Sequence, residues 1–205
     1  MSDTTSPAGP DGGNPAGRGL GRIPDILIAT IALVVTSPIL LVAAILIKLT
    51  SRGPVLYRQT RVGLRGAPFE MLKLRTMTLG SDPVGVGTPV LENDPRVTKV
   101  GHFLRRFSLD ELPNFVNVLR GEMAVVGPRP TLQAQVDGYT PHQRRRLDVP
   151  PGITGWTQVN GRAGIPWEER IELDIWYVNN RSPLLDLKII LRTVKQLITG
   201  HGLYG

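Results

Sequence analysis

The most prominent feature of the hydropathy pattern is a run of 22 residues without a charged side chain, 26–47. Eighteen of these residues are apolar, which meets the length of about 20 apolar residues that a membrane helix needs. Ser37 and Pro38 interrupt the run near its centre. Because proline removes a backbone donor and clashes with the preceding turn, the pattern predicts a kink or a break in the helix at Ser37 and Pro38.

Two membrane arrangements fit this run, a kinked helix that spans the bilayer or a re-entrant helix that enters and leaves one leaflet. At about 1.5 Å per residue, neither half alone crosses a hydrocarbon core of about 30 Å. Basic residues flank the run on both sides: Arg18, Arg22, Lys48, Arg52, Arg58 and Arg61. Positive charge prefers the cytoplasmic side, which favours the re-entrant form without excluding the span. A buried core helix is the third interpretation, but 22 residues that are apolar all round are too much core for this chain.

The rest of the chain predicts shorter elements of both kinds. Two strands, Val55 to Thr60 and Phe69 to Arg75, are joined by a turn with Gly63 and Gly66. Helices are predicted at 99–109, 113–120, 166–180 and 184–199. The last helix places five apolar residues on one stripe: Leu184, Leu187, Leu191, Val194 and Ile198. That stripe predicts either ordinary core packing or a basic amphipathic helix that lies on a membrane.

Composition divides the chain into three parts. Residues 1–22 are rich in Ser, Thr, Gly, Pro and Ala without an aromatic residue, which predicts a disordered N-terminal tail. Residues 23–50 form the predicted membrane helix, and residues 51–205 form a separate domain. This domain holds 21 Lys and Arg against 14 Asp and Glu, and therefore the whole net charge of +7. Such a charge behind a membrane anchor predicts anionic partners, namely lipid headgroups, phosphates or nucleic acid.

The residue types that are missing narrow the chemistry. The chain has no cysteine, which excludes disulfides, cysteine-ligated zinc and a cysteine nucleophile. The three histidines, His102, His142 and His201, have no metal-ligand spacing. A histidine-based metal site or a Ser-His-Asp triad is therefore not expected.

The sharpest local motif is Ser108-Leu109-Asp110-Glu111. Ser-x-x-Glu is a capping box and could be no more than that, although Pro113 fits a helix that starts after the acidic pair. Four arginines surround the pair in sequence: Arg105, Arg106, Arg120 and Arg129. Positive charge and a helix N-terminus keep a carboxylate ionised at neutral pH and attract phosphate. An ionised Asp110 can then attack a phosphoryl group, and Glu111 can hold Mg²⁺.

Two proline-rich and glycine-rich loops supply further polar groups. In Gly127-Pro128-Arg129-Pro130, two prolines hold the backbone around an arginine suited to bidentate phosphate binding, although a plain turn is the simpler interpretation. The loop 150–162 carries side chains that could stack on a base or hydrogen-bond a nucleotide or sugar: Trp156, Gln158, Asn160 and Arg162. The simpler interpretation is a conformationally special loop.

Taken in order, these motifs resemble the bacterial sugar transferase family. The resemblance extends from about Pro24 to Thr199 and rests on these segments: Ser37-Pro38, 73–77, 94–98, 108–113, 121–130 and 151–162. Members that share these motifs are monotopic polyprenyl-phosphate phosphoglycosyl transferases, and this chain resembles their short, catalytic-core form. The fold class implied is mixed α/β and mostly helical. It combines a re-entrant membrane helix with a small cytoplasmic domain of short strands and interfacial amphipathic helices, including 184–199.

The resemblance also implies a reaction. Asp110 would attack the β-phosphate of a UDP-sugar and release UMP, and polyprenyl phosphate would then attack the covalent phospho-sugar. Mg²⁺ is the expected cofactor, with Asp110 and Glu111 as its ligands, and Glu111 could instead assist proton movement. Phosphates or substrate would be held by these residues: Arg106, Arg129, Lys73, Arg75, Gln158, Asn160 and Arg162. The reaction would be the first membrane step of surface-glycan synthesis.

The resemblance places the enzyme at the bacterial inner membrane, with the catalytic domain on the cytoplasmic face. Membrane lipids and the two substrates are then the expected partners, nucleic acid is not, and a homodimer is left open. A non-enzymatic, membrane-anchored basic protein that binds anionic lipid or nucleic acid is the alternative; it explains the charge but not the acidic pair. A transferase that moves the sugar without its phosphate would release UDP instead of UMP. The sequence does not identify the sugar.

Overall fold

The computed structural model describes residues 18–81, 94–161 and 164–199, which form a mostly helical protein with two small sheets. The first half consists of α1 (Arg22–Thr50), β1 (Leu56–Val62), the 3₁₀ turn Leu64–Gly66, β2 (Pro68–Leu74), α2 (Lys99–Arg106), the 3₁₀ turn Leu109–Glu111 and α3 (Asn114–Arg120). The second half consists of β3 (Ala124–Val126), α4 (Gln133–Asp137), α5 (Pro141–Arg144), the 3₁₀ turn Arg145–Leu147, β4 (Gly152–Thr154), α6 (Trp156–Asn160), α7 (Trp167–Asn180) and α8 (Pro183–Thr199).

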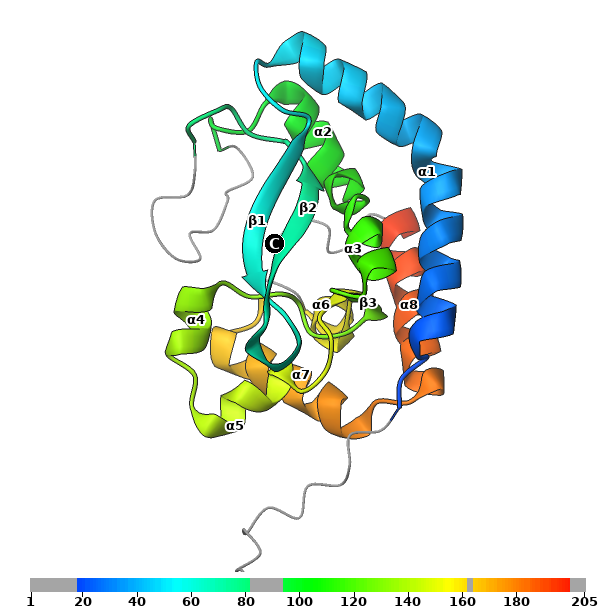
Figure 1. Cartoon of the computed structure of the whole chain (residues 1–205), viewed down its shortest axis with the longest axis vertical. Helices are drawn as coiled ribbons and strands as arrows, with labels where there is room; N and C mark the ends of the chain where they lie inside the picture. The colour runs from blue at the N-terminus through cyan, green and yellow to red at the C-terminus, as the bar shows by residue number, and fades with distance from the viewer. Residues whose placement is uncertain (1–17, 82–93, 162–163, 200–205) are drawn as a thin grey trace, which may run out of the picture.

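The elements form layers, with the β1–β2 hairpin on one side, α1 and α8 on the other, and α3 between them (Figure 1). The hairpin is antiparallel, in a register that pairs Leu56 with Leu74 and Val62 with Pro68. The predicted strands are therefore confirmed within two residues at each end. The short parallel pair β3–β4 was not predicted, because three-residue strands show no periodicity.

Helix α1 is one bent helix of 29 residues, which has the shape of the kinked helix and not of two helices around a break, the two alternatives that the sequence left open. Figure 1 shows its axis turning in the second half. Pro38 lacks the N–H that would bond the carbonyl oxygen of Val34, and the Ser37 hydroxyl donates to that oxygen instead, at 2.8 Å. The serine thus replaces the lost hydrogen bond, and the helix bends and continues where the sequence predicted a kink or a break.

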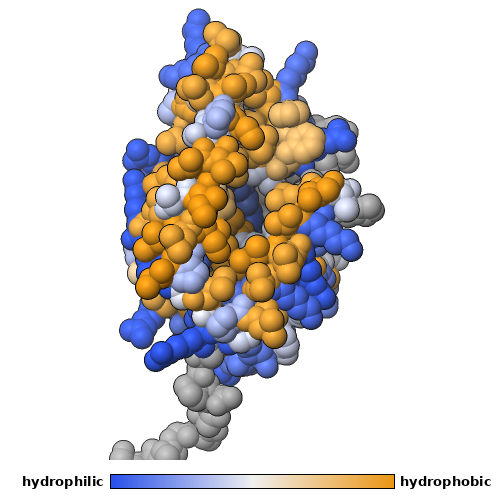
Figure 2. All heavy atoms as spheres, turned by 90° about the vertical axis from the view of Figure 1, so that its right-hand side faces the viewer, coloured by the Kyte–Doolittle hydropathy of each residue, from blue (hydrophilic) through white to orange (hydrophobic). Residues whose placement is uncertain are grey.

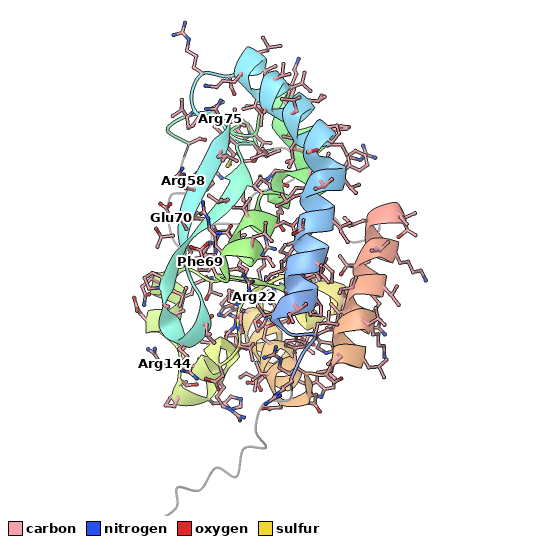
Figure 3. All side chains as sticks on the ribbon, turned by 45° about the vertical axis from the view of Figure 1, so that its right-hand side comes forward. Arg22, Arg58, Phe69, Glu70, Arg75 and Arg144 are labelled. Atoms are coloured by element: carbon pink, nitrogen blue, oxygen red, sulfur yellow. The ribbon has the colours of Figure 1, made fainter. Side chains whose placement is uncertain are left out.

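The domain holds both ends of α1. At the first turn, Arg22 donates to the carbonyls of Val118 and Leu119, and the carboxylate of Asp25 accepts the Val125 N–H at 3.0 Å. Figure 3 shows Arg22 at this end of the helix and Arg75 near the other.

At the last turn of α1, the guanidinium of Arg75 donates to the carbonyl oxygen and hydroxyl of Ser51, at 2.9 and 2.8 Å. Ala43 and Ile47 pack against Leu74 and Leu104. The helix therefore lies along the domain, fixed at both of its ends.

The predicted tail does not end where the sequence suggested. Gly19 is buried, and the Leu20 N–H donates to the carboxylate of Asp186 at 2.8 Å, so at least these residues pack on the domain before α1 begins at Arg22. Residues 1–17 lie outside the described residues. The tail prediction therefore does not hold for its last residues, because a single buried carboxylate provides an acceptor that composition does not reveal.

The apolar stripe of α8 faces outward. Leu184 and Ile198 are 76% and 80% exposed, and Leu187, Leu191 and Val194 are exposed as well. The core-packing interpretation of this stripe is therefore wrong, because the buried residues of α8 are only Asp186 and Ile189.

Candidate active site

The Asp110–Glu111 pair lies in a tight turn between α2 and α3. Helix α2 ends at Arg106, three residues before the predicted end, and Ser108 then adopts a left-handed conformation with φ 53° and ψ 24°. Its side chain makes no capping hydrogen bond, so the capping-box interpretation is wrong. A non-glycine residue at positive φ reverses the chain direction at some cost in energy, and here the reversal places Asp110 in the interior.

This backbone conformation gives a stability prediction. Ser108→Gly is expected to leave the unfolding free energy nearly unchanged or slightly higher, because glycine adopts positive φ without steric cost. Ser108→Val is expected to lower it by about 1–2 kcal/mol, because a β-branched side chain is crowded in this region. Thermal unfolding of the two variants in the same detergent measures the difference. Equal melting temperatures would show that the turn carries no strain.

Glu111 is the centre of an ion-pair network from three segments. Its Oε1 lies 2.7 Å from Lys73 Nζ on β2 and 2.6 Å from Arg129 Nη2, which follows β3. Its Oε2 accepts a longer hydrogen bond, 3.4 Å, from Arg129 Nη1. Burial opposes ionisation of Glu111, but the charges and hydrogen bonds of Arg129 and Lys73 outweigh it and hold its pKa well below the usual value. Glu111 therefore stays ionised, which favours a positioning role over proton transfer.

Asp110 has the opposite environment. It is only 7% exposed, and none of the described side chains or backbone N–H groups donates a hydrogen bond to its carboxylate. Burial and the adjacent charge of Glu111 raise the pKa of Asp110 to about 6, against the opposing charges of Lys73, Arg105 and Arg129. It is mostly ionised at neutral pH, as expected, but burial and not the basic surroundings dominates its pKa. An ionised, unsolvated carboxylate is a competent nucleophile.

The arginine beside Asp110 is Arg105, whose charge lowers the pKa of that carboxyl. Arg106, which the sequence singled out, is exposed and has its guanidinium 5.9 Å from the ring centre of Phe107. Arg75 is buried against the end of α1 through Ser51, apart from the Glu111 network. The sequence could not separate these arginines, because it does not show where α2 ends.

The loop 150–162, which the sequence suggested as a nucleotide-binding or sugar-binding loop, lies beside the segment 127–130 that contains Arg129. The parallel strands β3 and β4 bring Gly127–Pro130 and Gly155–Gln158 to the same sheet edge. A Cβ on Gly155 would overlap the carbonyl of Gly127, so the two loops approach closely at that glycine, and the Gln158 amide oxygen lies beside it.

Asn160 and Arg162 were also predicted to bind substrate, and the structure describes only the first of them. Asn160 is exposed, and its side chain contacts the carbonyl of Trp156 and the guanidinium of Arg192 on α8, at 2.7 and 3.2 Å. Arg162 lies outside the described residues.

Two polar residues near the pair were not singled out from the sequence. Asn114, four residues after Asp110, is 1% exposed, and among the described residues neither its amide oxygen nor its nitrogen has a hydrogen-bond partner. Arg61 lies on the face of β1 that also carries Tyr57, whose cross-strand partner is Lys73. The strand period of two could have identified Arg61, because Tyr57, Gln59 and Arg61 alternate onto one face.

The donor set fits a magnesium ion that completes its coordination with substrate. Mg²⁺ is commonly held by one or two carboxylates together with water and substrate phosphates. Asp110 and Glu111 are adjacent carboxylates, and no described group of three or more acidic or histidine side chains could enclose a metal. The described site therefore offers two carboxylates, of Asp110 and Glu111, to a Mg²⁺ ion that also binds phosphate.

A wide apolar face lies on the side of the molecule formed by α1 and α8. Figures 1 and 3 both show α8 beside the first half of α1. Figure 2 shows apolar atoms gathered in two ridges on this face, with a hollow between the ridges. Only 11% of the most apolar window of α1 is buried, and its length and composition would allow it to cross a membrane. Exposed apolar surface of this extent is typical of membrane contact.

The candidate site thus combines the buried carboxylate of Asp110 with Glu111, which Lys73 and Arg129 hold, in a molecule that also exposes a wide apolar face. A family model described as bacterial sugar transferase matches residues 17–200. The chain belongs to the bacterial sugar transferase family and is a transferase. The expected family is thereby confirmed.

Three relatives illustrate the range of the family. An uncharacterised sugar transferase, EpsL of Bacillus subtilis, is 45% identical over 184 residues, which are 90% of each chain. UDP-glucose:undecaprenyl-phosphate glucose-1-phosphate transferase of Escherichia coli is 46% identical over 86% of this chain. UDP-N-acetylgalactosamine-undecaprenyl-phosphate N-acetylgalactosaminephosphotransferase of Aeromonas hydrophila is 42% identical over 87% of this chain. The match spans only 40% and 43% of the length of the last two relatives.

Proposed function

We propose that this protein transfers a sugar 1-phosphate from a UDP-sugar to a polyprenyl phosphate through a covalent intermediate on Asp110. The observation that carries the proposal is the buried Asp110 carboxylate, without a described hydrogen-bond donor, beside a Glu111 that binds Lys73 and Arg129. The Escherichia coli and Aeromonas relatives are named for a UDP-sugar and undecaprenyl phosphate, which supports these two substrate classes.

The first step is a substitution at phosphorus. A carboxylate oxygen of Asp110 forms a bond to the β-phosphorus of the UDP-sugar, and the bond from that phosphorus to the bridging oxygen breaks. The bridging oxygen keeps the electron pair and leaves with the α-phosphate as UMP. Glu111 fixes Lys73 and Arg129, and these two cations would hold the phosphate oxygens. Asp110 and Glu111 would hold a Mg²⁺ ion, which would supply positive charge to neutralise the phosphates.

In the second step, Asp110 is the leaving group. A phosphate oxygen of the polyprenyl phosphate attacks the same phosphorus, the bond from that phosphorus to Asp110 breaks, and the carboxylate keeps the electron pair. The product is a polyprenyl diphosphate sugar. A two-step route suits substrates that come from different phases, because the nucleophile meets the soluble donor and the membrane-bound acceptor in turn.

The proposed membrane topology is re-entrant, with the domain on the cytoplasmic face of the inner membrane. One domain holds the first turn of α1 through Arg22 and Asp25 and the last turn through Arg75. A helix that crossed the bilayer alone would carry its two ends to opposite sides, which this shared anchorage opposes. The exposed stripe of α8 would lie at the same membrane surface, with its lysines and arginine near anionic headgroups.

Cysteine labelling can test this topology cleanly, since the chain contains no cysteine. Arg18→Cys and Arg52→Cys place single exposed thiols before and after α1. Both are expected to react with a membrane-impermeant maleimide in inverted vesicles, and neither in intact spheroplasts. Labelling of the two thiols from opposite sides would show a spanning helix and contradict the proposal.

The reaction itself is tested by presenting UDP-sugars with polyprenyl phosphate and identifying the nucleotide product. Release of UMP with formation of a polyprenyl diphosphate sugar is expected for at least one UDP-sugar. Release of UDP would instead indicate transfer of the sugar without its phosphate, and would contradict the proposal.

A further inference from the structure

Arg61 is a half-buried cation whose described hydrogen-bond partners carry no charge. Its Nε and Nη2 donate to the side-chain oxygen of Gln59 at 3.1 and 2.6 Å, and its Nη1 donates to the carbonyl of Pro130 at 3.3 Å. No carboxylate among the described residues forms an ion pair with it. The guanidinium is therefore held in one place by neutral oxygens, which fix its position without neutralising its charge.

A second cation lies next to it. Burial and the charge of Arg129 lower the pKa of Arg61 to about 10, and Tyr57 and Glu111 oppose that shift only in part. Glu111 forms ion pairs with Lys73 and Arg129 but none with Arg61. Burying a cation beside another cation is unfavourable unless an anion completes the arrangement. The unfavourable energy of the two neighbouring cations and the fixed position of the Arg61 guanidinium are both typical of a site that binds an anionic ligand.

The order of the cations shows which part of a substrate would lie there. The cations whose charges act on Asp110 are Lys73, Arg105 and Arg129, and Arg61 is not among them. Arg61 donates to the residue after Arg129 and is four residues, about 13 Å along β1, from Tyr57, the cross-strand partner of Lys73. Arg61 is therefore further from the nucleophile than Arg129 is. In a bound UDP-sugar, the phosphorus that Asp110 attacks would lie near Asp110, and the departing α-phosphate would lie further from it, toward Arg61.

We propose that Arg61, held by Gln59 and Pro130, binds the α-phosphate of the nucleotide-sugar together with Arg129 and retains it as the leaving nucleoside monophosphate. This inference rests on the proposed function. As the bridging oxygen takes the electron pair from the breaking bond, negative charge develops on the α-phosphate, and two guanidinium groups stabilise it there. Gln59 is a positioning residue, because it acts on the substrate only through Arg61.

The test measures UMP binding and the first reaction step in Arg61→Gln, with Arg58→Gln as the matched control. Arg58 lies on the same strand but on its opposite face, 64% exposed beside Glu70, so the control removes the same charge without touching the site (Figure 3). Arg61→Gln is expected to weaken UMP binding by about 10- to 100-fold and to raise the KM for the UDP-sugar similarly. The KM for polyprenyl phosphate and the values of Arg58→Gln should stay at those of the wild type.

Further variants separate binding from folding. Arg61→Lys keeps the charge but loses the fork of donors, and is expected to bind UMP with an intermediate affinity even if Arg61→Gln fails to fold. Gln59→Leu should weaken UMP binding less than Arg61→Gln, and its thermal unfolding reports any loss of structure. Unchanged UMP binding in a folded Arg61→Gln or Arg61→Lys variant would overturn the role of Arg61 alone. A wild-type protein that neither binds UMP nor releases it from any UDP-sugar would contradict the proposed function as well.

Discussion

Asp110→Asn is expected to lower UMP release from the UDP-sugar by at least about 10³-fold, while the protein remains in the membrane fraction. The amide is nearly the same size as the carboxylate but is a far weaker nucleophile. Because none of the described residues donates a hydrogen bond to Asp110, the replacement breaks no described contact. The fold and the apolar face of α1 and α8 should therefore survive the change.

The measurement is the single-turnover release of UMP by purified Asp110→Asn and by the wild type. Asp137→Asn is a matched control, because Asp137 contacts Gln133 on α4 and lies outside the ion-pair network. Wild-type rates are expected for this control. UMP release by Asp110→Asn at a rate near that of the wild type would eliminate Asp110 as the nucleophile.

Glu111→Gln has the second largest expected effect, a loss of about 10- to 100-fold in kcat/KM. Glu111 fixes both Lys73 and Arg129, and its removal leaves two phosphate-binding cations without their common anchor. Glu70→Gln is the control, because Glu70 is 57% exposed on the outer face of the hairpin and pairs only with Arg58 among the described residues. This control should retain full activity.

Glu111→Gln is also expected to change how the reaction rate depends on pH. Asp110 must be ionised to attack, so the wild-type rate is expected to fall as the pH drops through about 6. Burial is the main cause of that raised pKa and the charge of Glu111 is the second, so removal of the charge lowers the pKa of Asp110. The acid limb of the rate profile should therefore move to lower pH in Glu111→Gln. A limb that stays or moves to higher pH would contradict this coupling.

The strongly periodic elements and the motif residues were predictable from the sequence. The hairpin, α3, α7 and α8 follow their hydrophobic patterns, and the order of the motifs indicated the family. The strands β3 and β4 were missed because three residues are too short for a period. The sequence left a kink or a break open in α1, and the helix bends without breaking because the Ser37 hydroxyl satisfies the carbonyl that Pro38 leaves open.

The details of the site depended on tertiary structure. Asp110, Glu111, Lys73 and Arg129 were all named from the sequence, and the structure shows direct contacts of Glu111 with Lys73 and Arg129. The choice between neighbouring arginines was not predictable, because the left-handed turn at Ser108 ends α2 earlier than the hydrophobic pattern indicates. The sequence indicated Arg61 only as one of the basic residues that flank the apolar run. Its position beside Arg129 was not predictable, because it depends on how the β1–β2 hairpin contacts the segment after β3.

The covalent intermediate is tested most directly by the intact mass of the wild-type protein after incubation with Mg²⁺ and a UDP-sugar that the enzyme uses, without polyprenyl phosphate. A mass increase equal to one sugar phosphate is expected, located on the peptide that contains Asp110 and discharged when polyprenyl phosphate is added. Asp110→Asn should show no such increase. If turnover with both substrates proceeds while rapid quenching detects no adduct at any time, the transfer is direct and the covalent mechanism is contradicted.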